Sequence, residues 1–309
     1  MLKSKNSFGY LRKKYQLYLM LIPGFCFLFL YKIPSYYGLT MAFKDFNIFL
    51  GNNPIEAIGL SEWVGLDNFR RLFDNPDFFK VFRNTILISL YKIIYLFPLP
   101  IIAAILLNEI NSKLYKKLIQ TFIYIPYFFS WVIVFGIFYS LLGTYGLFNQ
   151  IINSFGYKSI SFFSDTKIFR GLLVATEGWK EMGWNTIIYL AAITSIEPTL
   201  YGAAKVDGAS KIQQIVYITI PGLLPTIVLM LIIRVGNVLR AGFEQILVMY
   251  NPTVYEVADV IETYIYRMGL GQMDFSLGTA LGLFNGVVAL ILIVSANVVS
   301  RKLLGRSIW

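Results

Sequence analysis

The sequence predicts an all-α, polytopic membrane protein with six transmembrane helices. Apolar residues make up 57% of the 309 residues, charged residues only 14%, and the mean hydropathy is +0.63. A bilayer crossing needs about 20 apolar residues, which predicts spans over roughly 16–42, 81–108, 115–142, 170–195, 222–247 and 275–300. Fixed-period repeats, low-complexity segments and half-to-half symmetry are absent from the sequence, so residues 16–309 are expected to form a single membrane domain.

The first span follows a basic segment, residues 1–15, whose cations are Lys3, Lys5, Arg12, Lys13 and Lys14. A basic start before an apolar run is also typical of a signal peptide. However, no small-residue cleavage site follows, and Lys32-Ile33-Pro34 comes instead. We therefore expect an uncleaved first helix.

The distribution of charge predicts the orientation, because Lys and Arg collect in the short cytoplasmic loops of membrane proteins. With a cytoplasmic amino terminus, the other inner cations are Lys113, Lys116, Lys117, Lys205, Lys211, Arg301, Lys302 and Arg306. The outer segments hold most of the acids, namely Asp45, Glu56, Glu62, Asp67, Asp74, Asp77, Asp165, Glu256, Asp259, Glu262 and Asp274. Both termini are thus expected in the cytoplasm. The net charge of +10 is expected to face anionic lipid rather than nucleic acid.

The longest outer loop is predicted over about 44–80. A turn at Gly51-Asn52-Asn53-Pro54 precedes a short amphipathic helix from Trp63 to Arg71. This segment is expected either to cap the helix ends or to contact an external partner.

Several kinds of chemistry are excluded by composition. Cys26 is the only cysteine and the chain has no histidine, so a disulfide within the chain, a thiolate cluster, a His-ligated metal and a Ser/His or Cys/His pair are all ruled out. No G-x-x-x-x-G-K-[ST] phosphate loop occurs. We predict no catalytic residue, no metal and no cofactor in this chain.

Two predicted spans carry polar stripes, although an ionisable side chain at membrane depth is costly unless it faces protein or water. At about 100° per residue, each stripe covers an arc of about 140°. The fourth-span stripe comprises Glu177, Lys180, Glu181, Trp184 and Asn185, and the fifth-span stripe comprises Arg234, Asn237, Arg240, Glu244 and Gln245. The stripes are expected to line a path for a polar solute. Alternatively, their Glu and Arg side chains pair between helices and hold the bundle together.

The residue types in this path favour a sugar over a bare ion. Trp179 and Trp184 offer aromatic faces, and Glu177, Asn185, Asn237 and Glu244 offer the hydrogen-bonding groups that hydroxyls need once stripped of water. We therefore predict an oligosaccharide.

The stretch from Gly202 to Pro221 is too polar for a lipid-buried helix. Two alanines, an Asp-Gly pair and an amphipathic run closed by Pro221 predict a short helix, a tight bend and a second helix that starts the fifth span. It is the centre of a predicted cytoplasmic loop over about 196–221. Such a shape suits docking to a partner, although a solvated connector would have a similar composition.

This stretch resembles the cytoplasmic signature of the permease subunits of binding-protein-dependent ABC importers. That signature is E-A-A, three residues, G, nine residues, I-x-L-P. Ala203, Ala204, Gly208 and Pro221 match it in spacing, whereas Gly202 stands where the family usually has Glu, and Ile220 where it has Leu. The resemblance implies a type I importer permease whose coupling residues are Gly202, Ala203, Ala204, Asp207, Gly208, Ala209 and Pro221.

Other pieces resemble the branch of that family assigned to polysaccharide and complex oligosaccharide uptake. They are 42–47, 64–69, 183–186, 242–245 and 250–252. The resemblance implies a bacterial plasma membrane location and a heterodimer with a second permease. It also implies two nucleotide-binding subunits that hold ATP and Mg, and an external solute-binding protein.

The mechanism that follows has a coupling helix from Thr199 to Lys211 seated on the ATPase. ATP-driven closure of the ATPase would move this loop and thereby open the passage, shifting the populations of inward-open and outward-open states. The alternative is a proton- or ion-coupled secondary transporter, with Glu177, Glu181, Arg234 and Glu244 as its relay. An ion channel and an intramembrane carboxylate enzyme are further alternatives.

Overall fold

A computed structural model describes residues 14–304 and divides the chain into two compact units. The first comprises the chain up to Asp74 together with Met268–Leu283, and the second comprises Asn75–Arg267 and the chain from Phe284 onward. Lys3, Lys5, Arg12, Lys13 and Arg306, which were predicted to be cytoplasmic cations, lie outside the described residues.

Within residues 14–304, five helical segments are long and apolar enough to cross a membrane. They are Tyr15–Phe43, Pro76–Glu109, Trp131–Ser154, Lys211–Gly236 and Phe275–Lys302. A bent pair, Phe169–Thr194 followed by Pro198–Val206 at 68°, brings the number to six. The all-α membrane fold class is confirmed.

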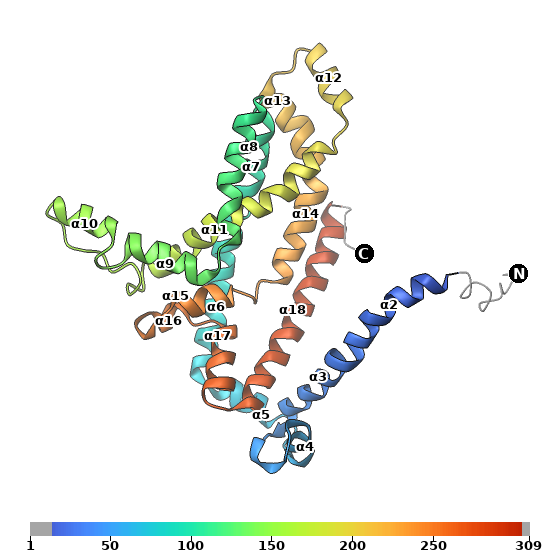
Figure 1. Cartoon of the computed structure of the whole chain (residues 1–309), viewed down its shortest axis with the longest axis vertical. Coiled ribbons are helices and arrows are strands. Elements are labelled where there is room, and N and C mark those ends of the chain that lie inside the picture. The colour runs from blue at the N-terminus through green and yellow to red at the C-terminus, as the bar shows by residue number, and fades with distance from the viewer. Residues whose placement is uncertain (1–13, 305–309) are drawn as a thin grey trace, which may run out of the picture. The chain divides into compact units, whose positions relative to one another are not determined.

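The first unit combines an apolar helical segment with a small cap. In chain order its elements are α2 (Tyr15–Phe27), η1 (Leu28–Lys32), α3 (Ile33–Tyr37), η2 (Gly38–Phe43), β1 (Lys44–Asp45), η3 (Ile48–Leu50), α4 (Pro54–Leu60), β2 (Glu62–Trp63), α5 (Asp67–Asp74), part of η7 (Tyr266–Gly271) and the start of α18 (Phe275–Leu304). Figure 1 labels these helices. The unpredicted β1–β2 ladder is antiparallel and pairs Lys44 with Trp63 and Asp45 with Glu62.

The cap is packed by polar bonds within the unit. Asn68 Nδ2 donates to the carbonyls of Ala42 (3.1 Å) and Lys44 (2.9 Å), and Arg71 pairs with Asp274 at 2.8 Å. In contrast, no residue of α2, η1 or α3 is buried. An apolar helix with no buried face within its own unit needs lipid or further protein around it.

The second unit holds the remaining elements, shown in Figure 1. They are α6 (Pro76–Leu96), α7 (Pro98–Glu109), α8 (Lys113–Tyr124), η4 (Ile125–Phe128), α9 (Trp131–Leu142), α10 (Leu147–Ser154), α11 (Phe169–Thr194), α12 (Pro198–Val206), α13 (Lys211–Gln214), η5 (Ile215–Thr219), α14 (Ile220–Gly236), α15 (Phe243–Met249), η6 (Pro252–Val254), α16 (Tyr255–Ala258), α17 (Ile261–Ile265) and the rest of α18.

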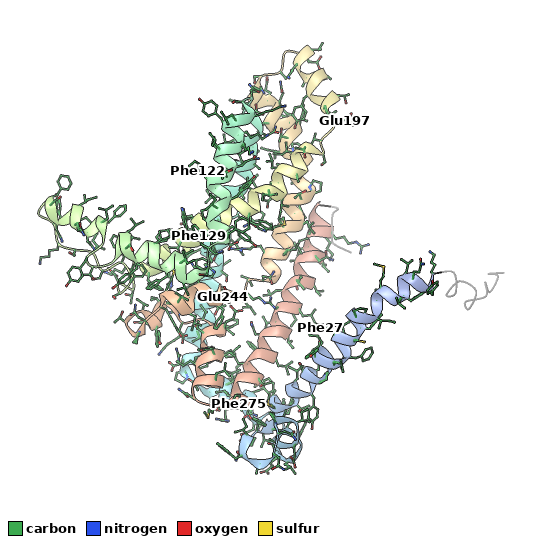
Figure 2. All side chains as sticks on the ribbon, in the orientation of Figure 1. Phe27, Phe122, Phe129, Glu197, Glu244 and Phe275 are labelled. Atoms are coloured by element: carbon green, nitrogen blue, oxygen red, sulfur yellow. The ribbon has the colours of Figure 1, made fainter. Side chains whose placement is uncertain are left out.

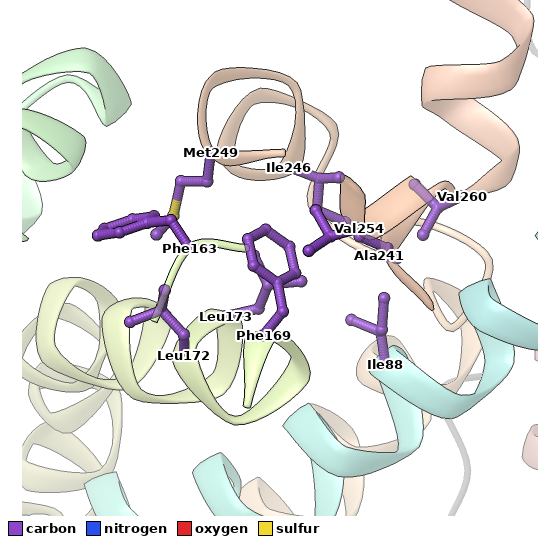
Figure 3. Close-up of a cluster of buried hydrophobic side chains, with 11 residues drawn as sticks. Ile88, Phe163, Phe169, Leu172, Leu173, Ala241, Ile246, Met249, Val254 and Val260 are labelled. Atoms are coloured by element: carbon purple, nitrogen blue, oxygen red, sulfur yellow. The ribbon is translucent and has the colours of Figure 1, made fainter. Parts of the chain in front are cut away.

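Two apolar clusters hold this unit around α11. In the first, Phe169 and Leu173 of α11 pack with Ile88 of α6 and Ile246 of α15 (Figure 3). The second joins Tyr189 and Ile193 of α11 to Ala104 of α7 and Leu223 of α14. These contacts fix α11 against the helices that carry the polar residues described below.

The third predicted span, 115–142, is not one helix. α8 ends at Tyr124, η4 contains Pro126, and the side chain of Ser130 caps α9 by accepting a bond from the Ile133 amide (3.3 Å). Proline has no amide hydrogen to continue a helix, and a serine cap starts a new one. The span candidate therefore runs from Trp131 to Ser154.

The fifth predicted span, 222–247, is wrong at both ends. The helical segment begins at Lys211 and stops at Gly236, where Asn237 Nδ2 donates to the Ile233 carbonyl at 3.0 Å. Pro221 therefore lies inside a continuous segment, separated from the π-helical turn η5 by Ile220 alone, and does not open the span. A π-turn shifts the backbone hydrogen bonds by one residue, which accommodates a residue without an amide donor.

Candidate functional site

The first candidate site is the helical loop Pro198–Gln214, formed by α12, a turn and α13. Pro198 occupies the first turn of α12, where a missing amide hydrogen costs little. Figure 1 shows α12 and the start of α13 together at one extremity of the second unit. The predicted order of short helix, bend and second helix is confirmed.

A Schellman motif makes the bend. Gly208 has φ +76°, its amide donates to Lys205 O (3.1 Å), and the Ala209 amide donates to Ala204 O (2.8 Å). This pair of bonds ends α12 and favours glycine at the left-handed position. The predicted coupling helix, Thr199 to Lys211, is therefore too long: it ends at Val206, and Lys211 begins the next helix.

The tip of the helical loop is open. Gly202, Ala203, Asp207 and Gly208 are exposed, and Ala204 and Ala209 are half-buried. Pro221, beyond the loop in α14, is exposed as well. Apolar side chains stand out around them, with Val206 88% exposed and Ile212 and Tyr217 also exposed. A Cβ added at Gly202 would meet no atom within 4 Å, so the usual Glu would fit there. The helical loop therefore presents an exposed, partly apolar surface.

The base of the helical loop is fastened by contacts that the sequence analysis missed. Lys211 Nζ donates to Glu109 Oε2 of α7 at 2.6 Å, and the hydroxyls of Tyr201 and Thr219 lie 3.0 Å apart. Gln214 Nε2 also donates to Ala209 O at 2.9 Å. These bonds connect the loop to α7 and η5, so that a displaced loop would pull on both.

The second candidate site is a buried ionic cluster of Glu177, Lys92 and Arg234. The two carboxylate oxygens of Glu177 on α11 are shared: Oε1 accepts from Arg234 Nη2 of α14 at 2.6 Å, and Oε2 pairs with Lys92 Nζ of α6. The Lys92 side chain is only 3% exposed, against 40% for Arg234. The expectation that Glu and Arg pair between helices thus holds for Glu177 and Arg234.

The sequence did not lead us to select Lys92 as a site residue, although a lysine inside an apolar run marks a functional or paired position. Its Nζ also donates to Ala241 O and Gln245 Oε1, both at 2.6 Å. Gln245 Nε2 in turn donates to Leu173 O (2.7 Å) and Thr176 Oγ1 (2.8 Å). Gly242, at φ +99°, leaves room for the ammonium, because a Cβ there would lie 2.9 Å from Lys92 Nζ. The backbone after α14 is therefore folded around this lysine.

A cavity of about 220 Å³ opens beside the cluster. Glu177, Glu181 and Asn185 line it from α11, and Arg234 and Asn237 line it from the end of α14. The structure thus brings five of the predicted path residues to one hollow, with Leu96 and Tyr189 among its apolar walls.

The other predicted path residues lie elsewhere. Trp179 lines a different cavity, and Trp184 stacks on Tyr127 with ring centroids 4.5 Å apart. Arg240 is exposed beyond the end of α14, and Glu244 is exposed on α15, where Figure 2 marks it. The single fifth-span stripe is wrong, because Asn237 and Gly242 end one helix and begin another.

Comparison with known proteins gives consistent similarities over nearly the whole chain. A family model described as "Binding-protein-dependent transport system inner membrane component" matches residues 96–306. The polygalacturonan/rhamnogalacturonan transport system permease protein YteP of Bacillus subtilis (strain 168) is 44% identical over 293 residues, which cover 94% of this chain and 89% of YteP. Protein LplB of the same organism is 42% identical, covering 94% of this chain and 90% of LplB.

A solved structure is similar as well. A chain in the crystal structure of a bacterial alginate ABC transporter, in complex with an alginate pentasaccharide-bound periplasmic protein, superposes with a TM-score of 0.88 at 37% sequence identity. The similarity covers 98% of this chain and 100% of that one.

Proposed function

Because the chain belongs to the family of binding-protein-dependent transport system inner membrane components, we propose that it is the permease subunit of an ATP-driven importer for an oligosaccharide or polysaccharide. An external solute-binding protein delivers the glycan, and this chain forms part of its passage through the bacterial plasma membrane. The relatives named for polygalacturonan, rhamnogalacturonan and alginate support a glycan as cargo.

The observation that carries the mechanism is the helical loop, open at its tip and bonded at its base. Its exposed Ala203 and Val206 seat on a separate ATPase subunit. ATP and Mg are bound there, since this chain has no phosphate loop. The termini and this loop face the cytoplasm, following the distribution of cations.

Movement of the helical loop reaches the smaller cavity, of about 220 Å³, through the two helices that adjoin the loop, one ending before it and one starting within it. α13, η5 and α14 run without interruption from Lys211 to Gly236, and Arg234 lies in the last turn of that segment. α11 and α12 meet at a 68° bend, and α11 carries Glu177, Glu181 and Asn185. A tilt of either helix changes the width of the cavity between them.

Partners follow from surfaces that are left uncovered within the first unit. The apolar helices α2 and α3 have no buried residue, which suits lipid and a second, homologous permease. The complete importer contains this heterodimer, two nucleotide-binding subunits and the solute-binding protein.

Uptake by proteoliposomes tests this function. The complete complex should import a glycan only with ATP inside, with the solute-binding protein outside, and with the nucleotide-binding subunits present. A protonophore should leave uptake unchanged. Uptake by this chain alone that a protonophore abolishes would instead establish the secondary transporter, with Glu181 as a relay candidate.

A further inference from the structure

A larger cavity, of about 890 Å³, lies next to the ionic cluster in the second unit. It shares Leu96, Leu99, Gly178 and Met182 with the smaller cavity. Its other lining residues come from α6 and from the start of α11 and the residues just before it. Its volume falls within the range of about 300–1,000 Å³ found for small-molecule sites.

The charge lining this cavity is entirely positive. Lys167 and Arg170 line it, and no Asp or Glu does. Arg170 is held by neutral acceptors, with Nε donating to Val257 O (3.0 Å) and Nη2 to Asn84 Oδ1 (2.8 Å). Among the residues that the structure describes, neither cation forms an ion pair with a carboxylate. The smaller cavity differs, because there Glu177 neutralises Arg234.

The walls and floor suit a flat ring. Tyr91 and Tyr95 of α6 line one side, with ring centroids 6.4 Å apart, and Trp179 of α11 lies on the lining as well. Gly171 and Ala175, one helical turn apart on α11, form the floor of the cavity. Both are exposed, and neither has a side chain long enough to fill the space above the helix. Aromatic faces pack on the apolar faces of sugar rings, and the small residues let a ring approach the helix.

We propose that this cavity is a subsite for the anionic units of the imported glycan, uronate sugars whose carboxylate binds Lys167 and Arg170 while the ring packs on Trp179 and the two tyrosines. The inference rests on the proposed function and narrows its substrate to acidic glycans. A carboxylate gains charge-assisted hydrogen bonds from unpaired cations, whereas a neutral sugar gains no comparable term.

Cysteine protection tests the subsite independently of transport. In the complete complex, with any cysteines of the partner subunits replaced, Cys26→Ala removes the one cysteine of this chain and Ala175→Cys places a thiol on the exposed floor. Trigalacturonate should slow labelling of this thiol by a maleimide, and the neutral trisaccharide made by reducing its carboxyl groups should not. Adding Lys167→Gln should raise the half-protecting concentration of trigalacturonate about fivefold, as expected for one solvent-accessible ion pair.

Lys158→Gln is the matched control, since Lys158 is exposed on the same unit but does not line the cavity. It should leave protection unchanged. Equal protection by the charged and neutral trisaccharides, or a half-protecting concentration of trigalacturonate that Lys167→Gln leaves unchanged, would overturn the subsite. A thiol at 175 that reacts only after the two permeases are separated would also overturn it, by showing that a partner helix fills the cavity.

ATP-driven glycan uptake, measured in the same vesicles, separates the two proposals. Uptake without charge-selective protection refutes the subsite alone. Absence of any ATP-dependent uptake of either trisaccharide or of longer glycans refutes the importer function itself.

Discussion

Replacing Glu177 by glutamine tests the ionic cluster most sharply. Glu177→Gln keeps the shape of the side chain but removes the carboxylate that Lys92 and Arg234 share. Removing one partner of a buried ion pair costs about 3–5 kcal/mol, because the other charge stays buried. Lys92 keeps Ala241 O and Gln245 Oε1 as acceptors, so we expect a value near the lower limit, about 3 kcal/mol.

That free energy corresponds to an apparent melting temperature lowered by about 6–12 °C, at 2–4 °C per kcal/mol. Tryptophan fluorescence of the solubilised complex during heating measures it. Lys92→Met is the matched variant: Glu177 keeps Arg234, so the loss should be smaller. The double variant Lys92→Met/Glu177→Gln should regain most of the stability, since no buried charge is left unpaired. A single variant as stable as the unmodified chain, or a double variant no better than Glu177→Gln, would refute this reasoning.

Three further predictions concern the helical loop. Gly208→Ala should destabilise the turn by about 1 kcal/mol, because φ +76° is strained for any residue with a Cβ. It should lower ATP-driven uptake, whereas the control Gly202→Ala should not. Equal uptake by the two variants would contradict the role of the turn. Gly202→Glu should fold normally, since a Cβ at this position meets no neighbouring atom. The variant should also retain the nucleotide-binding subunits on co-purification. Loss of these subunits would mean that the usual Glu does not fit this loop. Lys211→Ala should change the melting temperature of the complex by no more than about 4 °C, because an exposed pair with Glu109 is worth at most about 1 kcal/mol, and the change should vanish at high salt. A larger, salt-independent loss would show that the contact is stronger than an exposed pair.

The fold class and most spans could be predicted because they depend on local apolar content. The fourth span was placed at 170–195 and α11 occupies Phe169–Thr194. The fifth span failed because its apolar run was extended through Asn237 and Gly242. The side chain of Asn237 caps the end of α14, and the left-handed Gly242 precedes the start of α15. The third failed in the same way at Pro126 and Ser130.

The helical loop was predictable in outline because its turn is local. Gly208 and Ala209 bond within the same short segment, so the Asp-Gly pair predicted the bend. The ionic cluster was predictable only in part. Glu177 and Arg234 stood out as charges within spans, but Lys92 joins them from a distant helix and bonds to Ala241, a residue with no polar side chain. Nothing in the sequence near Lys92 points to these partners.

Labelling of a single cysteine in the helical loop tests the central claim most directly. Ala203→Cys in a Cys26→Ala chain places one thiol on the exposed face of α12. In sealed vesicles of known orientation, a membrane-impermeant maleimide should reach this thiol only from the cytoplasmic side, and only after the nucleotide-binding subunits have been stripped away. Labelling from the opposite side, or labelling at the same rate with and without those subunits, would contradict the account.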